Sequence, residues 1–188
     1  MYIKIIITLL FIILFYIYFH RHPPINIPHI NDNIILAPAY GTIKKIKYKD
    51  NYIHIIIFLS PLDVHVQYYP IRGNVIKQEH DFSGKYHLAF QLNKSDLNEK
   101  VITTIKPSIN INNIIVQQIA GFFVRRISTT IKNIPKNGIN IEPGNKLGMI
   151  HFGSRVDLIL PSNNLHLFVK ENQYVYGPYT QIGLYKKN

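Results

Sequence analysis

A serine that directly follows a glycine lies between two apolar stretches near the C-terminal end of the chain, within residues 146–161. Glycine leaves the Gly153 carbonyl open to close approach, and the chain itself holds the hydroxyl of Ser154 beside that carbonyl. This pair suits an N→O acyl shift, in which Ser154 Oγ attacks the Gly153 carbonyl and an ester replaces the peptide bond. Elimination from the ester can leave a pyruvoyl group at position 154. A β-bulge or a turn between two strands uses the same residues, and this local pattern alone favours the turn.

A second pair of reactive side chains stands at Asp63 and His65, two positions apart. On a strand the two side chains share one face. The carboxylate could then orient the imidazole and stabilise its cationic form, and the imidazole could take a proton from a serine hydroxyl. A half-buried histidine with a local hydrogen bond is the alternative for so short a pattern.

The chain carries a formal net charge of +11 over 188 residues. Such a balance favours nucleic acid, an acidic membrane surface or anionic substrates as partners. The lysines of residues 44–49 are typical of an exposed edge strand. Anionic lipid therefore fits the rest of the chain better than nucleic acid does, and no nucleic-acid partner is expected. With no cysteine, disulfides, Cys-ligated zinc and thiol nucleophiles are excluded. We expect no metal site, because His20 and His22 suit an interface better than a metal.

The N-terminal segment is apolar from residue 5 to residue 19. As a helix, this stretch spans roughly 22 Å, against a hydrocarbon core of about 30 Å. We predict a hydrophobic membrane anchor over residues 1–22, which makes the protein membrane-associated. A signal peptide is the alternative, but no small-residue cleavage site follows. Pro23, Pro24 and Pro28 forbid helix and predict an extended linker over residues 23–33.

Residues 34–188 read as many short strands separated by turn residues. We predict strands over 34–37, 41–48, 52–59, 64–69, 85–92, 101–105, 114–119, 122–127, 146–152, 155–160, 165–169 and 179–185. Gly73 and Asn74 predict a turn, residues 133–143 a loop, and residues 94–100 a loop with room for one helical turn. The expected fold is mainly β (α+β): a compact barrel or sandwich of short strands with an N-terminal hydrophobic helix.

Residues 144–161 resemble the processing segment of phosphatidylserine decarboxylases. The short, archaeal-type branch of that family reads G-x-x-x-G-x-I-x-F-G-S-R-V-D-x-x-x-P, which this chain matches in order. Residues 58–73 resemble the family's F-x-S-P-x-D-V-H-V-x-x-x-P-x-x-G motif. Weaker likenesses lie at residues 19–23, 80–86, 98–100 and 116–127, so the resemblance covers most of the chain.

The resemblance implies a proenzyme that cleaves itself between Gly153 and Ser154. The products would be a non-covalent pair of chains, 1–153 and 154–188. A pyruvoyl cofactor derived from Ser154 would act as electron sink in the decarboxylation of the anionic phospholipid phosphatidylserine to phosphatidylethanolamine. His65 would assist self-cleavage, decarboxylation or both, with Asp63 beside it. Arg125 and Arg126 could bind lipid phosphate or carboxylate, or form surface charge at a strand end.

Tyr40 departs from the family pattern. Residues 36–43 resemble S-P-A-D-G-x-(I/V), whose aspartate belongs to a Ser-His-Asp arrangement for self-cleavage, and Tyr40 stands at that position. A phenol carries no charge at neutral pH, and loss of the aspartate from a hydrolytic triad costs about 10⁴ in rate. We expect slow self-cleavage, with Asp63 as a substitute acid. The alternatives are an uncleaved pseudoenzyme that binds lipid and a basic, membrane-tethered domain that binds nucleic acid or another partner.

Overall fold

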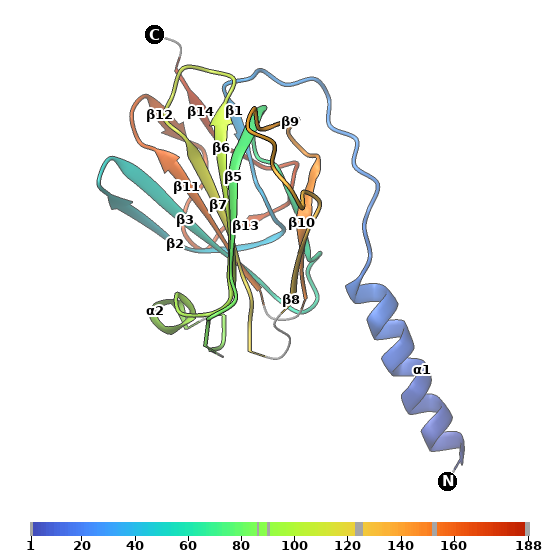
Figure 1. Ribbon diagram of the computed structural model, residues 1–188. Coiled ribbons are helices and arrows are strands. Elements are labelled where there is room, and N and C mark those ends of the chain that lie inside the picture. The colour runs from blue at the N-terminus through green and yellow to red at the C-terminus, as the bar shows by residue number, and fades with distance from the viewer. Residues whose placement is uncertain (1, 86, 90, 123–125, 152–153, 187–188) are drawn as a thin grey trace.

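An apolar helix stands apart from a β-rich domain in the computed structural model, which describes residues 2–85, 87–89, 91–122, 126–151 and 154–186 (Figure 1). Helix α1 (Tyr2–Phe19) has 18 residues, a length of about 27 Å. It is long and apolar enough to cross a membrane. Among its described residues only Phe19, at the C-terminal end, is buried. Residues 21–31 then run without regular secondary structure to the β domain.

The larger of the sheets has eight strands, all paired with antiparallel neighbours. Their order is β13 (Tyr174–Val175), β2 (Gly41–Lys49), β3 (Tyr52–Leu59), β11 (Ser154–Pro161), β7 (Ile114–Ile119), β6 (Lys100–Pro107), β5 (Gly73–Asp81) and β9 (Ile139–Ile141). Strand β11 lies in the interior of this sheet, and every one of its residues is buried.

Two three-stranded antiparallel sheets complete the domain. One has the order β1 (Ile34–Leu36), β14 (Gln181–Tyr185) and β12 (Leu165–Leu167). The other has the order β4 (Val66–Tyr68), β10 (Lys146–His151) and β8 (Arg126–Thr129). A short helix, α2 (Leu92–Ser95), precedes β6 and supplies the helical turn that the sequence allowed near residue 94.

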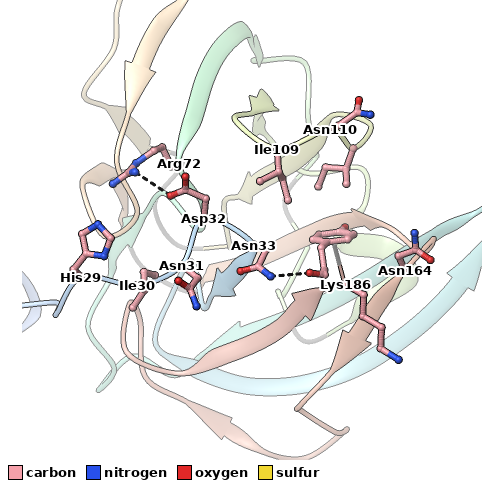
Figure 2. Close-up of a pocket in the computed structure, with 12 residues that line it drawn as sticks. His29, Ile30, Asn31, Asp32, Asn33, Arg72, Ile109, Asn110, Asn164 and Lys186 are labelled. Atoms are coloured by element: carbon pink, nitrogen blue, oxygen red, sulfur yellow. Dashed lines mark hydrogen bonds and ion pairs between the residues drawn. The ribbon is translucent and has the colours of Figure 1, made fainter. Parts of the chain in front are cut away.

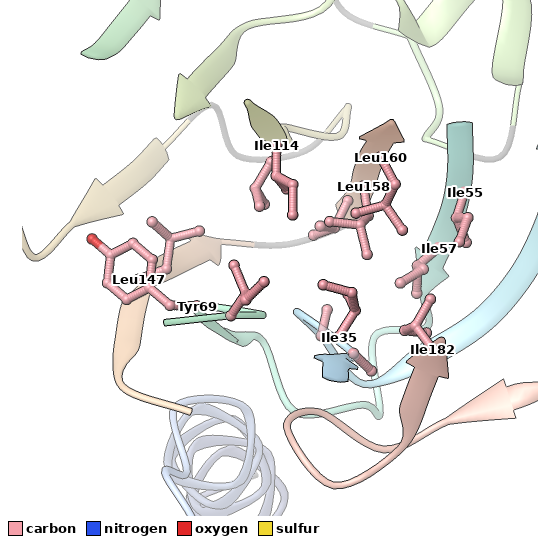
Figure 3. Packing of buried hydrophobic residues seen from close by; sticks show 14 of the residues in the cluster. Ile35, Ile55, Ile57, Tyr69, Ile114, Leu147, Leu158, Leu160 and Ile182 are labelled. Atoms are coloured by element: carbon pink, nitrogen blue, oxygen red, sulfur yellow. The ribbon is translucent and has the colours of Figure 1, made fainter. Parts of the chain in front are cut away.

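The hydrophobic core contains side chains from all three sheets. Figure 3 shows Leu158 and Ile57 of the large sheet with Ile35 and Leu147 of the small sheets, and all four side chains are fully buried. The terminal strands β13 and β9 do not pair with each other, so the large sheet does not close into a barrel. The expectation of a mainly β fold with an N-terminal apolar helix is confirmed, and of the two expected architectures the closed barrel is not formed.

Three local predictions are wrong in this part of the fold. Residues 133–143 are not a loop throughout, because Ile139–Ile141 form β9 and pair with β5. Gly73 and Asn74 do not form a turn but begin β5. The glycine is needed because the backbone of Lys106 on the neighbouring strand approaches so closely that a Cβ atom would not fit. The strand expected over 85–92 does not form in the described residues. The Asn98 side chain bonds to both backbone groups of His87 and so takes the place of a strand partner.

Candidate active site

Ser154 is located where the chain passes from one sheet to another. Strand β10 ends at His151 in a small sheet, and β11 begins at Ser154 in the large sheet, paired with Leu59 of β3. The Ser154 side chain is fully buried, and its Oγ has no hydrogen-bond partner among the described residues. Gly153, the other half of the predicted cleavage site, lies outside the described residues.

The imidazole of His65 is also fully buried. Its Nδ1 lies 2.9 Å from the backbone carbonyl oxygen of Asp63, and its Nε2 has no partner in the described part of the chain. A carbonyl can only accept, so Nδ1 carries the proton and Nε2 keeps a free lone pair. Burial lowers the pKa of His65 to about 4. The ring is therefore a neutral base at pH 7.

The backbone of His65 is tied to the strand that leads to Ser154. Its carbonyl accepts from the Ile150 N–H (3.3 Å) and from Gln67 Nε2 (2.6 Å). Gln118 of β7 in turn donates to Gln67 Oε1 (2.8 Å), and both glutamines are fully buried. This amide pair joins the large sheet to the small one beside His65. Neither glutamine was predicted from the sequence as a site residue, although Gln118 lies inside the family-like segment 116–127.

Asp63 takes a different place from the one expected. The strand predicted over 64–69 begins only at Val66, so Asp63 and His65 do not share a strand face. The carboxylate accepts instead from the Ser60 N–H (2.7 Å) and from the Tyr174 hydroxyl (2.6 Å). Asp63 reaches His65 through its backbone carbonyl, so its carboxylate fixes the loop rather than facing the ring.

Tyr40, at the family's aspartate position, is half-buried just before β2. Its ring packs edge-on against Tyr68 and Tyr176, with centroids 6.4 and 6.2 Å away. Burial raises the pKa of the Tyr40 phenol, so this position supplies no negative charge at neutral pH.

The C-terminal end of α1 forms one wall of the site. The ring of Phe19 lies 4.1 Å from that of His65, measured between centroids, and Phe19 is fully buried. Tyr18 Oη and Arg21 Nη2 both donate to the Leu62 carbonyl, at 3.1 and 2.7 Å. Helix α1 thus contacts the same loop, residues 60–65, that positions His65.

Polar groups also surround the end of β10. His151 Nδ1 lies 3.3 Å from His20 Nε2, and burial lowers the pKa of His151. Arg126 is exposed and pairs with His151 in the β8–β10 register. Arg126 is therefore close to the site, whereas Arg125 lies outside the described residues. No cluster of three or more metal-ligating side chains occurs in the part of the chain that the structure describes.

Arg155 holds the beginning of β11 in place from the outer face of the sheet. Its guanidinium binds both carboxylate oxygens of Asp157, at 2.7 and 2.6 Å. Nη1 also donates to the Leu92 carbonyl (2.8 Å), to Ser95 Oγ (2.9 Å) and to Asp96 Oδ1 (2.8 Å). Arg155 and Asp157 are 2% and 4% exposed, so this ion pair is little screened by solvent. It holds α2 against the residue that follows Ser154.

A large hollow of about 590 Å³ lies at the other end of the domain, beside Arg72, Asp32 and Asn33 (Figure 2). Its lining includes the turn after the far end of β11, at Asn164, and the end of β14, at Tyr185. Ser154 begins β11 at the opposite end. The hollow is therefore separate from the reactive groups.

Comparison with known proteins identifies the family. The sequence profile described as phosphatidylserine decarboxylase matches residues 12–182. The chain belongs to the phosphatidylserine decarboxylase family. The phosphatidylserine decarboxylase proenzyme of Amoebophilus asiaticus is 38% identical over 167 residues, covering 85% of this chain and 71% of the relative.

An archaeal relative matches over almost its whole length. The putative archaetidylserine decarboxylase proenzyme of Methanocaldococcus jannaschii is 35% identical over 196 residues, covering 92% of this chain and 91% of the relative. The proenzyme of Carboxydothermus hydrogenoformans is also 35% identical, with 81% of its length covered. No solved structure gave a significant match. The resemblance to the short branch of the family is confirmed.

Replacing Arg155 should destabilise the fold strongly. In a chain carrying Ser154→Ala, the further change Arg155→Met leaves Asp157 buried without its partner, and we expect the free energy of unfolding to fall by about 3–5 kcal/mol. The matched control is Lys45→Met, which breaks the exposed pair with Glu171 and should cost less than about 1 kcal/mol. Urea unfolding in mild detergent measures both, and equal losses would contradict a buried clamp.

The depressed pKa of His65 predicts a dependence of stability on pH. Between pH 6.5 and 4 the unfolded chain binds a proton at this imidazole and the folded chain does not, so stability falls as pH falls. Because the imidazole pKa falls from its ordinary 6.5 to about 4, the loss is on the order of 3 kcal/mol. His65→Gln removes the titrating group. The difference between wild type and variant should therefore change across this window, and a constant difference would contradict the prediction.

Proposed function

We propose that the protein is a proenzyme that cleaves itself between Gly153 and Ser154 and then decarboxylates phosphatidylserine. One observation carries the proposal: Ser154 Oγ and His65 Nε2 are both buried and both lack a partner in the described structure. Each buried polar group without a partner costs about 1–3 kcal/mol. Among the buried side-chain atoms that lack one in the described structure, Ser154 supplies an alcohol nucleophile and His65 a neutral base. Family membership supports this reading.

Self-cleavage begins with the Ser154 hydroxyl. Its oxygen attacks the Gly153 carbonyl carbon, the C–N bond breaks, and the freed nitrogen takes up a proton while an ester joins the two residues. Loss of the Ser154 Cα proton then expels the Gly153 carboxylate. Hydrolysis of the remaining enamine consumes one water and releases ammonia, which leaves a carbonyl at residue 154. The neutral His65, with its free Nε2, suits the acceptance of the hydroxyl proton and its return to nitrogen.

The pyruvoyl group supplies the electron sink for the carbon–carbon bond that breaks. The residues of this chain supply position and protons. Pairing of Ser154 with Leu59 and the ties of Arg155 hold the reacting terminus in place. Burial excludes water from the neighbourhood of Ser154. Nε2 of His65 is suited to hold the proton that replaces the departing carboxyl group.

A phospholipid substrate agrees with the charge and the N-terminal helix. We propose that α1 lies in the membrane and holds the domain at an anionic lipid surface, to which the net charge of +11 is complementary. Arg126, exposed beside His151, is placed to contact a lipid phosphate or carboxylate. Chains 1–153 and 154–188 would remain together as a non-covalent pair, since β11 is hydrogen-bonded between β3 and β7.

A second function has one specific observation in its favour. Tyr40 places a neutral, half-buried phenol where the family motif carries an acid. A chain that has lost the acid and no longer cleaves would be a lipid-binding pseudoenzyme. The two functions differ in the covalent state of the purified protein.

Intact mass and carbon dioxide release together test the proposed function. Wild-type protein from membranes should yield chains 1–153 and 154–188. Their summed mass should equal the mass of the intact chain plus one water minus one ammonia. It should also release CO2 from carboxyl-labelled phosphatidylserine in mixed micelles. Ser154→Ala should abolish both, whereas the matched control Ser162→Ala should change neither.

The outcomes separate the parts of the proposal. A wild-type chain that stays intact and releases no CO2 supports the pseudoenzyme. A cleaved chain that is inactive on phosphatidylserine retains the self-cleavage chemistry and rejects the substrate.

Restoring the acid at position 40 should accelerate self-cleavage. A carboxylate stabilises an imidazolium far better than a phenol does, and loss of the carboxylate from a triad lowers the rate about 10⁴-fold. We therefore expect Tyr40→Asp to speed self-cleavage at least about tenfold. Tyr40→Asn is the matched neutral control. The cleaved fraction is followed by mass spectrometry after a pulse of cell-free synthesis. Equal rates for the two variants would show that charge at position 40 plays no part.

A further inference from the structure

Five neighbouring strands of the eight-stranded sheet have one end in the same row, and Ser154 is the end of one of them, β11. The paired residues of this row are Leu59, Ser154 with Arg155, Ile119, Lys100 and Asp81. The connections that adjoin these residues therefore leave the sheet at the same edge, the end of the domain near α2 and β8 in Figure 1. We call residues 60–65, 82–85, 91–99 and 120–122 the loop edge.

Large apolar side chains are exposed in each part of the loop edge. Leu62 is 62% exposed, Phe82 69%, Leu97 53% and Phe122 47%. At the opposite end of the strands, the connections at Asp50 and Asn51 and at residues 162–164 are polar, and the two isoleucines of the connection 108–113 are half-buried. Apolar groups gathered on one side of a domain mark a surface that contacts a partner or a membrane.

Helix α1 joins the domain at the loop edge. Tyr18 and Arg21 bond to the carbonyl of Leu62, the residue whose side chain is exposed there. In Figure 1, α1 extends past the lower end of the domain, where α2 and β8 are also labelled, with α2 at the left and α1 at the right. Of the four exposed apolar residues, Leu62 is the one whose backbone is bonded to α1 in the described structure.

Exposed basic side chains lie in the loop edge and beside it. Lys85 and Lys94 belong to the loop edge, and Arg126 lies at the start of β8. The acidic groups of this region have partners within the domain: Asp96 is paired with Arg155 and Glu99 with His80, while Asp63 and Asp81 accept hydrogen bonds from Tyr174 and Ser83. Basic groups beside exposed apolar residues are the pattern of proteins that lie on anionic bilayers.

We propose that the loop edge is a second membrane-contacting surface, so that the bilayer lies against the end of the sheet at which Ser154 begins β11. Leu62, Phe82, Leu97 and Phe122 would enter the interfacial region while the lysines face lipid phosphates. This inference rests on the proposed anchoring of α1, but it does not depend on self-cleavage or on catalysis.

The absence of tryptophan allows a direct test. Leu62→Trp, Phe82→Trp and Phe122→Trp each introduce a single tryptophan, which can be excited selectively over the tyrosines, into the full chain in the Ser154→Ala background. Each protein is reconstituted into vesicles of phosphatidylcholine and phosphatidylglycerol with brominated or unmodified acyl chains. Leu14→Trp, within α1, is the positive control. Tyr48→Trp is the negative control, because Tyr48 is 71% exposed at the far end of the β2–β3 hairpin.

Bromine should quench the three loop-edge fluorophores at least about twofold more strongly than Tyr48→Trp, as expected for side chains in the interface. Quenching of Leu14→Trp with the loop-edge variants unquenched overturns the inference and leaves the anchor in place. No quenching of Leu14→Trp rejects the anchoring itself. A blue shift that depends on protein concentration but not on bromine would assign the surface to a second copy of the chain.

Discussion

Burial of the two reactive side chains where the chain changes sheet is the constraint on which the proposed chemistry depends. Ser154 and His65 are both fully buried there. Water would satisfy Ser154 Oγ and Nε2 of His65 and would raise the imidazole pKa toward its ordinary value. Removing water leaves a neutral base and an uncompeted hydroxyl at neutral pH. The large apolar core built by three sheets supplies stability that offsets the cost of burying Ser154 Oγ and His65 Nε2 without a partner among the described residues.

On the outer face of the large sheet, Arg155 fixes the strand whose inner face carries Ser154. Along β11, alternate side chains point to opposite faces, so Arg155 points away from Ser154 and is free to bind Asp157 and the backbone of α2. If the chain is cleaved, Asp157 belongs to the same product as Arg155, whereas Leu92, Ser95 and Asp96 belong to the other. The guanidinium would then link the two chains one residue after the new terminus, and together with the pairing of Ser154 and Leu59 it would limit movement of that terminus.

Most of the strand pattern and the reactive residues could be predicted from the sequence, because local alternation and ordered motifs carry that information. Strand β5 could not, because Gly73 satisfies a close contact with a distant strand that the local Gly-Asn pattern does not reveal. The same limit applies to Asp63. Its spacing from His65 predicts a shared face, but Tyr174, more than a hundred positions away, holds the carboxylate elsewhere. The packing of the Phe19 ring against His65 is likewise a long-range contact that no local pattern encodes.

That contact bears on how a lipid headgroup could reach the site. If α1 lies in the bilayer, its first charged or polar residues after the apolar run, His20 and Arg21, mark the headgroup level. Phe19 precedes them directly and its ring packs against that of His65, so the imidazole lies at nearly the same depth. A serine headgroup would then need little displacement from the membrane to approach the buried base. The end of the anchor is consequently part of the site wall, and any tilt of α1 would act on Phe19 and on the Leu62 carbonyl that Arg21 holds.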